Sequence, residues 1–587
     1  MTEYFEVHER DGAARLGELR LADPLATPAL ADPVLEDAGS LWAAEREVPA
    51  GDEAALTILP HRAFPAGTPE DVQEAFAVDY PDVDYPSAAV VSPESAADHG
   101  SDAYVLSTAQ GVVGHGAAFV EAVRTTREAI PPDAALYLPG VATPGNVATL
   151  VYAGVDLVDT DRAVVAGTRG RYLTTGGERH LDELAAEDEL PCACAACVEA
   201  GGPANLDQDG CAEHNVARLR AALATVRGRI REGRLRDYLE GQARHEQWHT
   251  ATMREFDQQW GYLEQRTPLL RETEMTAASG DTLQRVEIRR FADRVTSRYR
   301  CRFDEPLVLL PCSATKPYSE SQSHEQFHDA IQYRAHKVSM TSPIGVVPQE
   351  LELTYPAQHY DAVVTGRWTE SEVAFVAEVL RRYLERNEYP RVVAHLPEDY
   401  RPIVERATSD LDVDPEYTVA DHPTTTDSIA NLMRTLSDEL KYPRREREHN
   451  TVRAVADYML GDGAGDDLFE DVETAGRYPK LQVRDRDGTQ LAALVPNYGV
   501  LAFTLAGAGR WVESDAPTKT VEIDDFVPHG SVLAPGVVEA DDDVRVGDEV
   551  VVEGPQAFGV GRAAMSGPEM ARSSRGIAVE VRHVAET

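Results

Sequence analysis

Lysine is almost absent from this chain of 587 residues, in which 56 basic side chains face 100 acidic ones and the formal net charge is −44. The only five lysines are Lys316, Lys337, Lys441, Lys480 and Lys519. Such an excess of carboxylates opposes compaction by self-repulsion, unless multimolar salt shortens the screening length to about 3 Å. The composition therefore indicates adaptation to a salt-filled cytoplasm in a halophilic organism. It does not exclude a nucleic-acid partner, which would need a local arginine patch.

The chain also lacks any uninterrupted apolar stretch of about 18 residues, so no membrane-spanning helix is predicted. Its first residues, MTEYFEVHERDGAARLG, are polar and acidic and contain no hydrophobic signal region. Six cysteines in the whole chain are too few for a secreted disulfide framework. We therefore expect a cytoplasmic protein with no membrane association, long enough for roughly four domains.

Periodicity predicts a multidomain α/β fold. Strand-like and helix-like segments alternate over residues 87–170 and again over 305–440, which is typical of parallel sheets covered by helices. Residues 478–512 resemble a small α+β unit, and the acidic segment 461–471 is expected to be a loop. Residues 518–584 contain many short strands with turn glycines, which predicts a small β-barrel.

One segment is densely basic. A helix is predicted over residues 216–240, and seven arginines fall between positions 216 and 236. Two interpretations stay open: a solvated helix face, or a stripe that contacts phosphates.

Three cysteines form a C-x-C-x2-C cluster, and a histidine follows shortly afterwards. The residues are Cys192, Cys194, Cys197 and His214. Three thiolates and one imidazole complete a tetrahedral zinc shell with no open position, which is typical of a structural site. Cys211 is the alternative fourth ligand.

This pattern resembles the zinc site of tRNA-guanine transglycosylases, in which the cysteines are followed by a His-Asn pair at a helix start, as in His214-Asn215. Residues 139–167 resemble the closing strands of that family's (β/α)8 barrel, and residues 14–30 resemble its opening. The resemblance favours His214 as the fourth ligand. It implies a degenerate TIM barrel with a Zn²⁺ site over residues 1–270.

Asp159 ends a predicted barrel strand, where the catalytic groups of TIM barrels lie. In the transglycosylases an aspartate at this place attacks the ribose, and a second aspartate lies in an Asp-Ser-Gly-x-Phe-Gln motif. That motif and the Gly-rich base-binding loop are missing here. We therefore interpret Asp159 as a relic of the nucleophile position or as a residue that fits tRNA.

The C-terminal segments resemble RNA-binding modules. Residues 525–584 resemble a PUA domain, and residues 480–511 resemble the small domain that precedes it in archaeal transglycosylases. The resemblance implies a pre-PUA domain over 445–512, a PUA domain over 513–587, and tRNA as the partner, modified at position 15 of the D-arm. Candidate RNA contacts, with ordinary surface arginines as the alternative, are Arg562, Arg572, Arg575 and Arg582.

A loop rich in reactive groups follows the apolar strand EPLVLLP. Between Cys312 and His324 it holds a thiol, an amine, a phenol, several hydroxyls and an imidazole. In an open α/β sheet, this is where a ligand site lies. Lys316 adds weight because the chain otherwise replaces lysine with arginine, and an ammonium can lose a proton or lower the pKa of a thiol. The alternative is a polar turn with a small buried cysteine.

The loop resembles the signature P-C-x3-K-P-Y-S-x-S-x-S-H of the archaeosine synthases, paralogues of the transglycosylases, and every fixed position matches. The resemblance implies an α/β catalytic domain over residues 285–440. It implies addition of an amine to the nitrile of 7-cyano-7-deazaguanine at position 15 of tRNA, in archaeosine biosynthesis. The donor is an amino acid such as lysine or glutamine, or ammonia. A radical-SAM partner enzyme and a homodimer are compatible with it.

We expect the Cys312 thiolate to add to the nitrile carbon, with Lys316 or His324 lowering the thiol pKa and protonating the developing imide. The groups expected to hydrogen-bond the base or the donor are Tyr318, Ser321 and Ser323. Glu350 and Glu352 are candidates for binding or deprotonating the donor ammonium. The alternative functions are a tRNA-guanine(15) transglycosylase, a non-catalytic tRNA-binding protein and a redox thiol protein.

Overall fold

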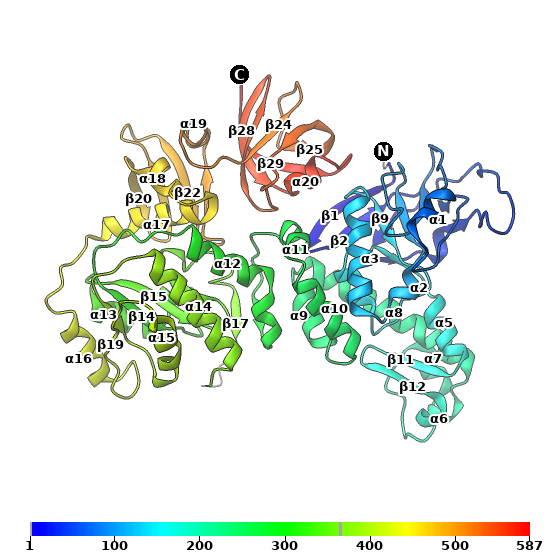
Figure 1. The fold of residues 1–587 in the computed structure, drawn as a ribbon, viewed down its shortest axis with the longest axis horizontal. Helices are drawn as coiled ribbons and strands as arrows, with labels where there is room; N and C mark the ends of the chain where they lie inside the picture. The colour runs from blue at the N-terminus through cyan, green and yellow to red at the C-terminus, as the bar shows by residue number, and fades with distance from the viewer. Residues whose placement is uncertain (1–2, 363–366) are drawn as a thin grey trace. The chain divides into compact units, whose positions relative to one another are not determined.

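The computed structural model describes residues 3–362 and 367–587, and the chain divides into two compact units. The first 268 residues form one unit together with 533–535 and 568–578, and the remaining residues form the other. In Figure 1 the first unit runs mainly from blue to green and the second from green to red. Among the described residues, no helix combines the length and the apolar content that a membrane crossing requires.

The first unit is built on a seven-stranded parallel sheet, in which the consecutive strands β4 and β5 form the two edges. The chain from Leu30 to Leu35 spans at most about 17 Å, whereas seven strands laid flat extend about 29 Å. The sheet therefore curls toward itself, which confirms the predicted degenerate barrel. In sheet order the strands are β4 (Ala29–Leu30), β10 (Leu157–Val158), β9 (Ala135–Tyr137), β8 (Ala103–Leu106), β7 (Ser87–Val91), β6 (Leu56–Ile58) and β5 (Leu35–Asp37).

Two smaller sheets complete the strands of this unit. An antiparallel sheet holds β1 (Phe5–Asp11), β2 (Ala14–Leu19) and β3 (Leu25–Thr27), and a hairpin holds β11 (Arg171–Thr174) and β12 (Gly177–His180). The helices are α1 (Glu70–Ala75), α2 (Ala109–Val112), α3 (Gly116–Ala129), α4 (Val147–Tyr152), α5 (Asp161–Thr168), α6 (Leu181–Leu184), α7 (Ala195–Ala200), α8 (Gln208–Arg231), α9 (Leu235–Gln242), α10 (Gln247–Asp257) and α11 (Trp260–Arg266).

The basic helix predicted over 216–240 is two helices in the structure. It begins earlier, at Gln208 of α8, and it is interrupted before Leu235 of α9. Gly233 between them has a φ of +65°, a left-handed conformation that glycine adopts without strain. The predicted apolar stripe packs inward, because Leu219, Leu223, Val226 and Ile230 are buried.

The second unit contains a five-stranded sheet that is parallel except for one edge strand, β16. Successive side chains of β14 pack in two different hydrophobic cores, one on each face of the sheet. Leu307 and Leu309 belong to one core, and Val308 and Leu310 belong to the other. In sheet order the strands are β16 (Gly345–Pro348), β15 (His336–Thr341), β14 (Leu307–Pro311), β18 (Val392–Ala394) and β19 (Glu416–Tyr417). The helices of this region are α12 (Val286–Ser297), α13 (Gln322–Ile331), α14 (Glu370–Arg386), α15 (Arg401–Thr408) and α16 (Thr426–Thr435). A separate parallel pair joins β13 (Met275–Ala277) to β17 (Tyr360–Ala362).

Two small modules follow, and they complete the predicted multidomain α/β class. The first contains α17 (Arg444–Leu460), α18 (Ala464–Phe469), β20 (Glu473–Arg477), β21 (Lys480–Arg484), β22 (Gln490–Val495), β23 (Val500–Phe503) and α19 (Leu505–Glu513). The second contains β24 (Thr520–Ile523), β25 (Ser531–Leu533), β26 (Val537–Ala540), β27 (Glu549–Gly554), β28 (Ala557–Ala563), α20 (Gly567–Met570) and β29 (Ile577–Glu586). The segment 461–471, predicted as a loop, contains the helix α18.

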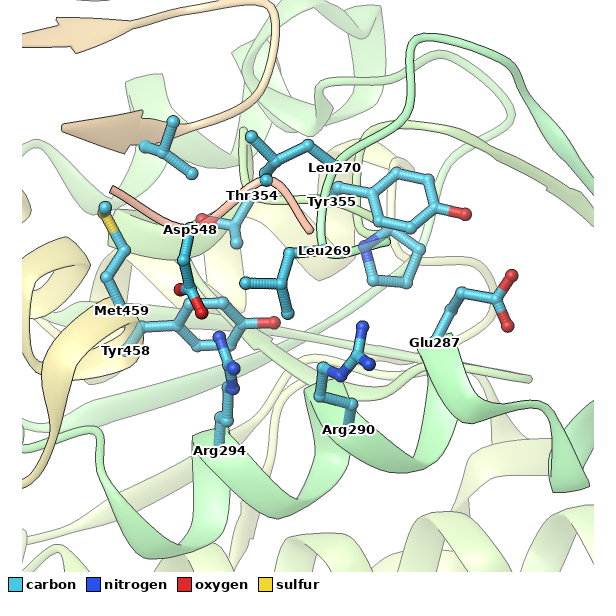
Figure 2. Close-up of a pocket in the computed structure, with 13 residues that line it drawn as sticks. Leu269, Leu270, Glu287, Arg290, Arg294, Thr354, Tyr355, Tyr458, Met459 and Asp548 are labelled. Atoms are coloured by element: carbon cyan, nitrogen blue, oxygen red, sulfur yellow. The ribbon is translucent and has the colours of Figure 1, made fainter. Parts of the chain in front are cut away.

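A small cavity lies inside the second unit. Its lining comes from α12, from the C-terminal end of α17 and from the turn Gly547–Asp548, as Figure 2 shows.

Candidate active site and metal centre

The reactive loop lies at the switch point of the five-stranded sheet. The chain leaves β14 to form β15 on one side of it and later returns to form β18 on the other. Cys312 directly follows β14 and is half-buried. Its Sγ lies 3.6 Å from Oη of Tyr400, the last residue of a short 3-10 helix, Glu398–Tyr400, that follows β18. The thiol and the phenol thus meet across the crevice in which open α/β sheets bind their ligands.

Lys316 lies over an aromatic ring in the same loop. Its Nζ is 4.0 Å from the centroid of the Tyr360 ring and 3.5 Å from the carbonyl oxygen of Ala314. Burial lowers the pKa of Lys316, and a charge on Cys312 opposes that shift. The ammonium is therefore near enough to sense a Cys312 thiolate and easier to deprotonate than an ordinary lysine.

Tyr318 and His324 hold the loop in shape. The Tyr318 ring stacks on the His324 ring at 5.1 Å between centroids, and its Oη lies 2.7 Å from Oη of Tyr360. His324 Nε2 donates to the carbonyl oxygen of Pro311 at 2.9 Å, just before the cysteine. Burial lowers the pKa of His324 to about 4. The imidazole is therefore neutral near pH 7, and its Nε2 proton is engaged by the backbone just before Cys312.

The two serines and Glu352 fix the same loop from other directions. Ser321 Oγ accepts from the backbone N–H of His324 at 3.2 Å and caps α13, while it lies 3.3 Å from Ser323 Oγ. The buried Glu352 carboxylate accepts from the Ser319 N–H at 2.9 Å and from Tyr478 Oη at 2.6 Å. Glu352 therefore ties the loop to the module that follows the sheet.

Glu350 lies in a different environment. Its Oε2 accepts from Tyr299 Oη at 3.1 Å and is 3.0 Å from Nε2 of His336. The facing carboxylate raises the pKa of His336, against the effect of burial, to about 10. This ion pair occupies the Glu350 carboxylate, whereas the Glu352 carboxylate binds the Ser319 N–H and Tyr478.

Three residues beside the loop were not predicted from the sequence: Tyr360, Tyr400 and Lys337. Tyr400 and Tyr360 come from distant segments and belong to no motif. Lys337 carries the same signal as Lys316, namely lysine in a chain that avoids it. It lines a small cavity beside His324 and Arg447, and burial lowers its pKa to about 8.

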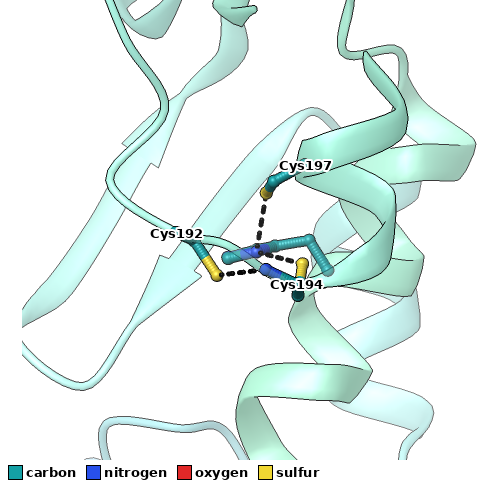
Figure 3. Close-up of side chains that lie close together, drawn as sticks. Cys192, Cys194 and Cys197 are labelled. Atoms are coloured by element: carbon teal, nitrogen blue, oxygen red, sulfur yellow. Dashed lines mark hydrogen bonds between the residues drawn. The ribbon is translucent and has the colours of Figure 1, made fainter. Parts of the chain in front are cut away.

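The predicted metal ligands converge. Figure 3 shows the thiol groups of Cys192, Cys194 and Cys197 gathered in one place, at the start of α7 and in the segment before it. His214 Nδ1 is 3.3 Å from Cys197 Sγ and 3.4 Å from Cys194 Sγ, and all four ligand atoms lie within 4.8 Å of one another. Cys211 is buried outside this group.

The histidine has the tautomer that a metal needs. Its Nε2 lies 2.9 Å from the carbonyl oxygen of Leu173 and donates to it, which leaves the Nδ1 lone pair facing the sulfurs. Asn215 beside it accepts from the Leu173 N–H at 2.8 Å and donates to the carbonyl oxygen of Arg171 at 2.9 Å. The His-Asn pair thus joins α8 to β11, and the donor set fits a tetrahedral ion such as Zn²⁺.

Asp159 follows β10 as predicted, and its carboxylate is fully engaged. Oδ2 accepts from Tyr137 Oη and from the Gly140 N–H, both at 2.7 Å, and Oδ1 accepts from the Asp161 N–H at 3.1 Å. The side chain is buried, and burial raises its pKa. A cleft of about 780 Å³ lies at this end of the barrel, but Asp159 does not line it; residues that do include Gly140, Asn146, Arg162, Arg169 and Arg171.

The arginines proposed for RNA contacts already touch protein groups. Arg582 pairs with the carboxylate of Glu549, its Nη2 at 2.8 Å from Oε2, and Arg562 lies 5.0 Å from the centroid of the Tyr498 ring. Arg572 donates to backbone carbonyls at the end of α3, and Arg575 also has a protein partner.

The basic segment of α8 and α9 is not one stripe. Arg236 is buried against Asp257 and Glu240, and Arg227 donates to the carbonyl oxygen of Pro28. Arg229 pairs with Glu232 at the surface. Several members of the segment therefore stabilise the barrel rather than face an RNA.

Comparison with known proteins matches four separate stretches of the chain. Family models match residues 84–247 (queuine tRNA-ribosyltransferase), 288–436 (a domain of unknown function), 450–517 (patch-forming domain C2 of tRNA-guanine transglycosylase) and 521–585 (PUA domain). The archaeosine synthase of Haloferax volcanii is 66% identical over the full length of both chains. This chain belongs to the archaeosine synthase family.

More distant relatives agree with the assignment. The archaeosine synthase subunit alpha of Methanosarcina acetivorans is 41% identical over all of both chains. A tRNA-guanine(15) transglycosylase of Methanobrevibacter smithii is 24% identical over 80% of this chain and 69% of its own length. The resemblance inferred from the Cys312 loop is confirmed, and the predicted halophilic character fits the Haloferax relative.

Proposed function

We propose that this chain adds an amine to the nitrile of 7-cyano-7-deazaguanine at position 15 of tRNA and forms an amidine on the way to archaeosine. The observation that carries the proposal is the half-buried Cys312 thiol at the switch point of the sheet, between Tyr400 and the loop of Lys316. Membership of the family supports a tRNA-modifying transferase, and the PUA match supports tRNA as the partner.

The chemistry can be written in two balanced steps. The Cys312 thiolate adds to the nitrile carbon, a C–S bond forms, and the nitrile nitrogen takes a proton from the Lys316 ammonium to give a thioimidate. The donor amine then attacks the same carbon and loses a proton to Lys316. The C–S bond breaks, the thiolate leaves, and the amidine remains. The lowered pKa of Lys316 suits it to both proton transfers.

The other motif residues are proposed to position these two groups. His324 holds the backbone before Cys312, Ser321 caps α13, and Glu352 binds the N–H of Ser319. The half-buried Ser323 is available to the base or to the donor, whereas Tyr318 is buried and its hydroxyl is bonded to that of Tyr360, so that it supports the loop. The donor is an amino acid such as lysine or glutamine, or ammonia, and a radical-SAM enzyme completes archaeosine if a whole amino acid is added.

The barrel is proposed to support tRNA binding. Asp159 is engaged by three hydrogen bonds and does not line the neighbouring cleft, which supports a relic position over an active transglycosylase nucleophile. We propose structural Zn²⁺ on Cys192, Cys194, Cys197 and His214, where the ion joins the start of α7 to α8. We also propose that the chain acts in the cytoplasm as a homodimer.

A mass measurement tests the reaction. The purified chain is incubated in high potassium chloride with tRNA that carries 7-cyano-7-deazaguanine at position 15, with lysine, glutamine or ammonium supplied separately. Nucleosides from the digested tRNA are then weighed. A gain equal to the donor supports the proposal, and its size tells whether a second enzyme must cleave the adduct.

The matched controls are Cys312→Ser and Cys301→Ser, since Cys301 is the other half-buried thiol of the same domain. Addition that survives in purified Cys312→Ser would overturn the covalent step. No gain with any donor, from protein that still binds tRNA, would favour a binding role.

A further inference from the structure

The small cavity of the second unit has the features of a ligand site that the proposed reaction does not use. Segments distant in sequence enclose it, as Figure 2 shows: Leu269–Leu270, α12, residues 354–356, the end of α17 and the turn Gly547–Asp548. Its volume is about 20 Å³. A cavity of this size holds roughly one sphere of the size of a water molecule. A nucleotide is far too large for it.

An unpaired cation faces this cavity. Arg294 is only 6% exposed, and Figure 2 shows its side chain rising from α12 toward the cavity, next to that of Arg290. Within the described part of the chain, its guanidinium makes no hydrogen bond or ion pair. The guanidinium lies over the Tyr458 ring, whose centroid is 5.4 Å from Cζ. Burial of a charge costs several kcal/mol unless hydrogen-bonding partners compensate it.

The carboxylates that line the cavity are already neutralised. Glu287 lies 3.3 Å from Nη2 of Arg285, and Asp548 Oδ2 pairs with the Lys519 ammonium and accepts from the Arg545 N–H at 2.8 Å. Positive charge therefore accumulates around the cavity, in a chain whose net charge is −44. Burial and the like charge of Arg294 both lower the pKa of Arg298, one turn further along.

We propose that this cavity binds one small inorganic anion of the size of chloride, held by the guanidinium of Arg294. The volume admits a single halide, and the apolar walls of Leu269, Met459 and Val500 suit an ion that is weakly hydrated. A bound anion supplies the missing partner of Arg294. The ion links α12, in the domain that carries the Cys312 loop, to α17 and to the turn Gly547–Asp548 in the two modules that follow. The folding of these parts therefore depends on the anion present.

The test exchanges the anion at constant potassium concentration. Chloride is titrated into multimolar potassium gluconate, whose anion is too large for the cavity, and the Tm of the full chain is followed. The wild-type protein is expected to gain roughly 2–4 °C along a saturable curve. Arg294→Met is expected to lose that gain while it folds normally in gluconate, because it no longer buries an unpaired charge. Arg382→Met, which removes a partly exposed arginine of α14 that pairs with Asp293 outside the cavity, is expected to keep the gain.

Crystals soaked in bromide locate the ion directly. An anomalous peak beside Arg294 in the wild-type protein, absent in Arg294→Met, is the expected result. A linear rise in Tm that is equal in both variants reflects ionic strength alone and overturns the proposal. So does stabilisation by inorganic phosphate or tRNA but not by halides, which would assign the arginine to a phosphate group.

Discussion

Asp159 and Cys312 occupy equivalent places in two different sheets, yet their reactive atoms are engaged to different extents. Each directly follows the carboxyl end of a strand, β10 or β14. The Asp159 carboxylate is buried and accepts three hydrogen bonds, whereas the Cys312 thiol is half-buried and has one long contact with Tyr400. The end of a strand therefore places a side chain where a ligand can bind. Its burial and its hydrogen bonds decide whether its reactive atoms are accessible to that ligand.

The strongest test of this comparison removes the reactive atom of the open site. Cys312→Ser is expected to lower the rate of nitrile addition by at least about 10³-fold, because a serine hydroxyl is far less ionised than a thiol at neutral pH. The rate is measured by mass spectrometry of tRNA nucleosides, and tRNA affinity is measured alongside. Weakened tRNA binding with an unchanged rate at saturation would contradict the assignment.

The next largest effect concerns the barrel and is expected to be structural. Replacement of one ligand by Cys197→Ser, or removal of the ion by a chelator, is expected to lower the free energy of unfolding by at least about 3 kcal/mol. The segment from β11 to α8 is the part expected to open, because Asn215 and His214 join it through Leu173. Metal content and hydrogen exchange over residues 171–231 report the change. Equal protection with and without metal would contradict it.

The sequence predicted the metal site because its ligands lie close together and their spacing encodes one geometry. Three cysteines within six residues and a histidine on the next long helix need only one packing contact to converge. The Cys312 loop was recognisable for a similar reason, since its groups are contiguous. Tyr400, 88 residues away from Cys312, reaches it only through the order of strands in the sheet, which no local pattern encodes.

The missed helix α18 has a tertiary cause. Its sequence is rich in glycine and aspartate, residues that favour loops. In the structure Arg302 pairs with Asp466 of α18 and with Asp457 of α17, and the Gly465 N–H donates to Asp457. These contacts between segments override the local propensity. The break at Gly233, where the sequence predicted one continuous helix, has a local cause, because glycine adopts the left-handed conformation there without strain.

A smaller effect distinguishes the charge of Lys316 from its proton. Lys316→Arg keeps a cation beside the thiol but cannot release a proton near neutral pH, so a loss of about 10²-fold in kcat is expected. In the wild-type protein the rate should fall as pH rises through the lowered pKa of Lys316, because the ammonium is the acid form. Arginine is expected to flatten this alkaline limb. Lys441→Arg, at an exposed lysine bonded to Gln332, serves as the control and should leave the profile unchanged.

The smallest effect is expected at Asp159, and it completes the comparison. Asp159→Asn preserves an acceptor for Tyr137 and the Gly140 N–H but loses the bond from the Asp161 N–H, so the free energy of unfolding should change by about 1 kcal/mol or less. Nitrile addition should stay within about twofold of the wild-type rate.

The pH dependence of that variant follows from burial, which raises the pKa of Asp159 in the folded state. The folded protein then holds this proton more tightly than the unfolded chain, so the carboxyl favours folding at low pH and loses that effect as pH rises through the raised pKa. Asparagine does not titrate, and the variant should therefore gain stability relative to the wild-type protein as pH increases. Urea denaturation across a pH series measures the difference. If Asp159→Asn folds stably but its rate of nitrile addition falls by about 10²-fold or more, Asp159 still takes part in the chemistry. Three hydrogen bonds would then not be enough to make a carboxylate at a strand end catalytically inactive.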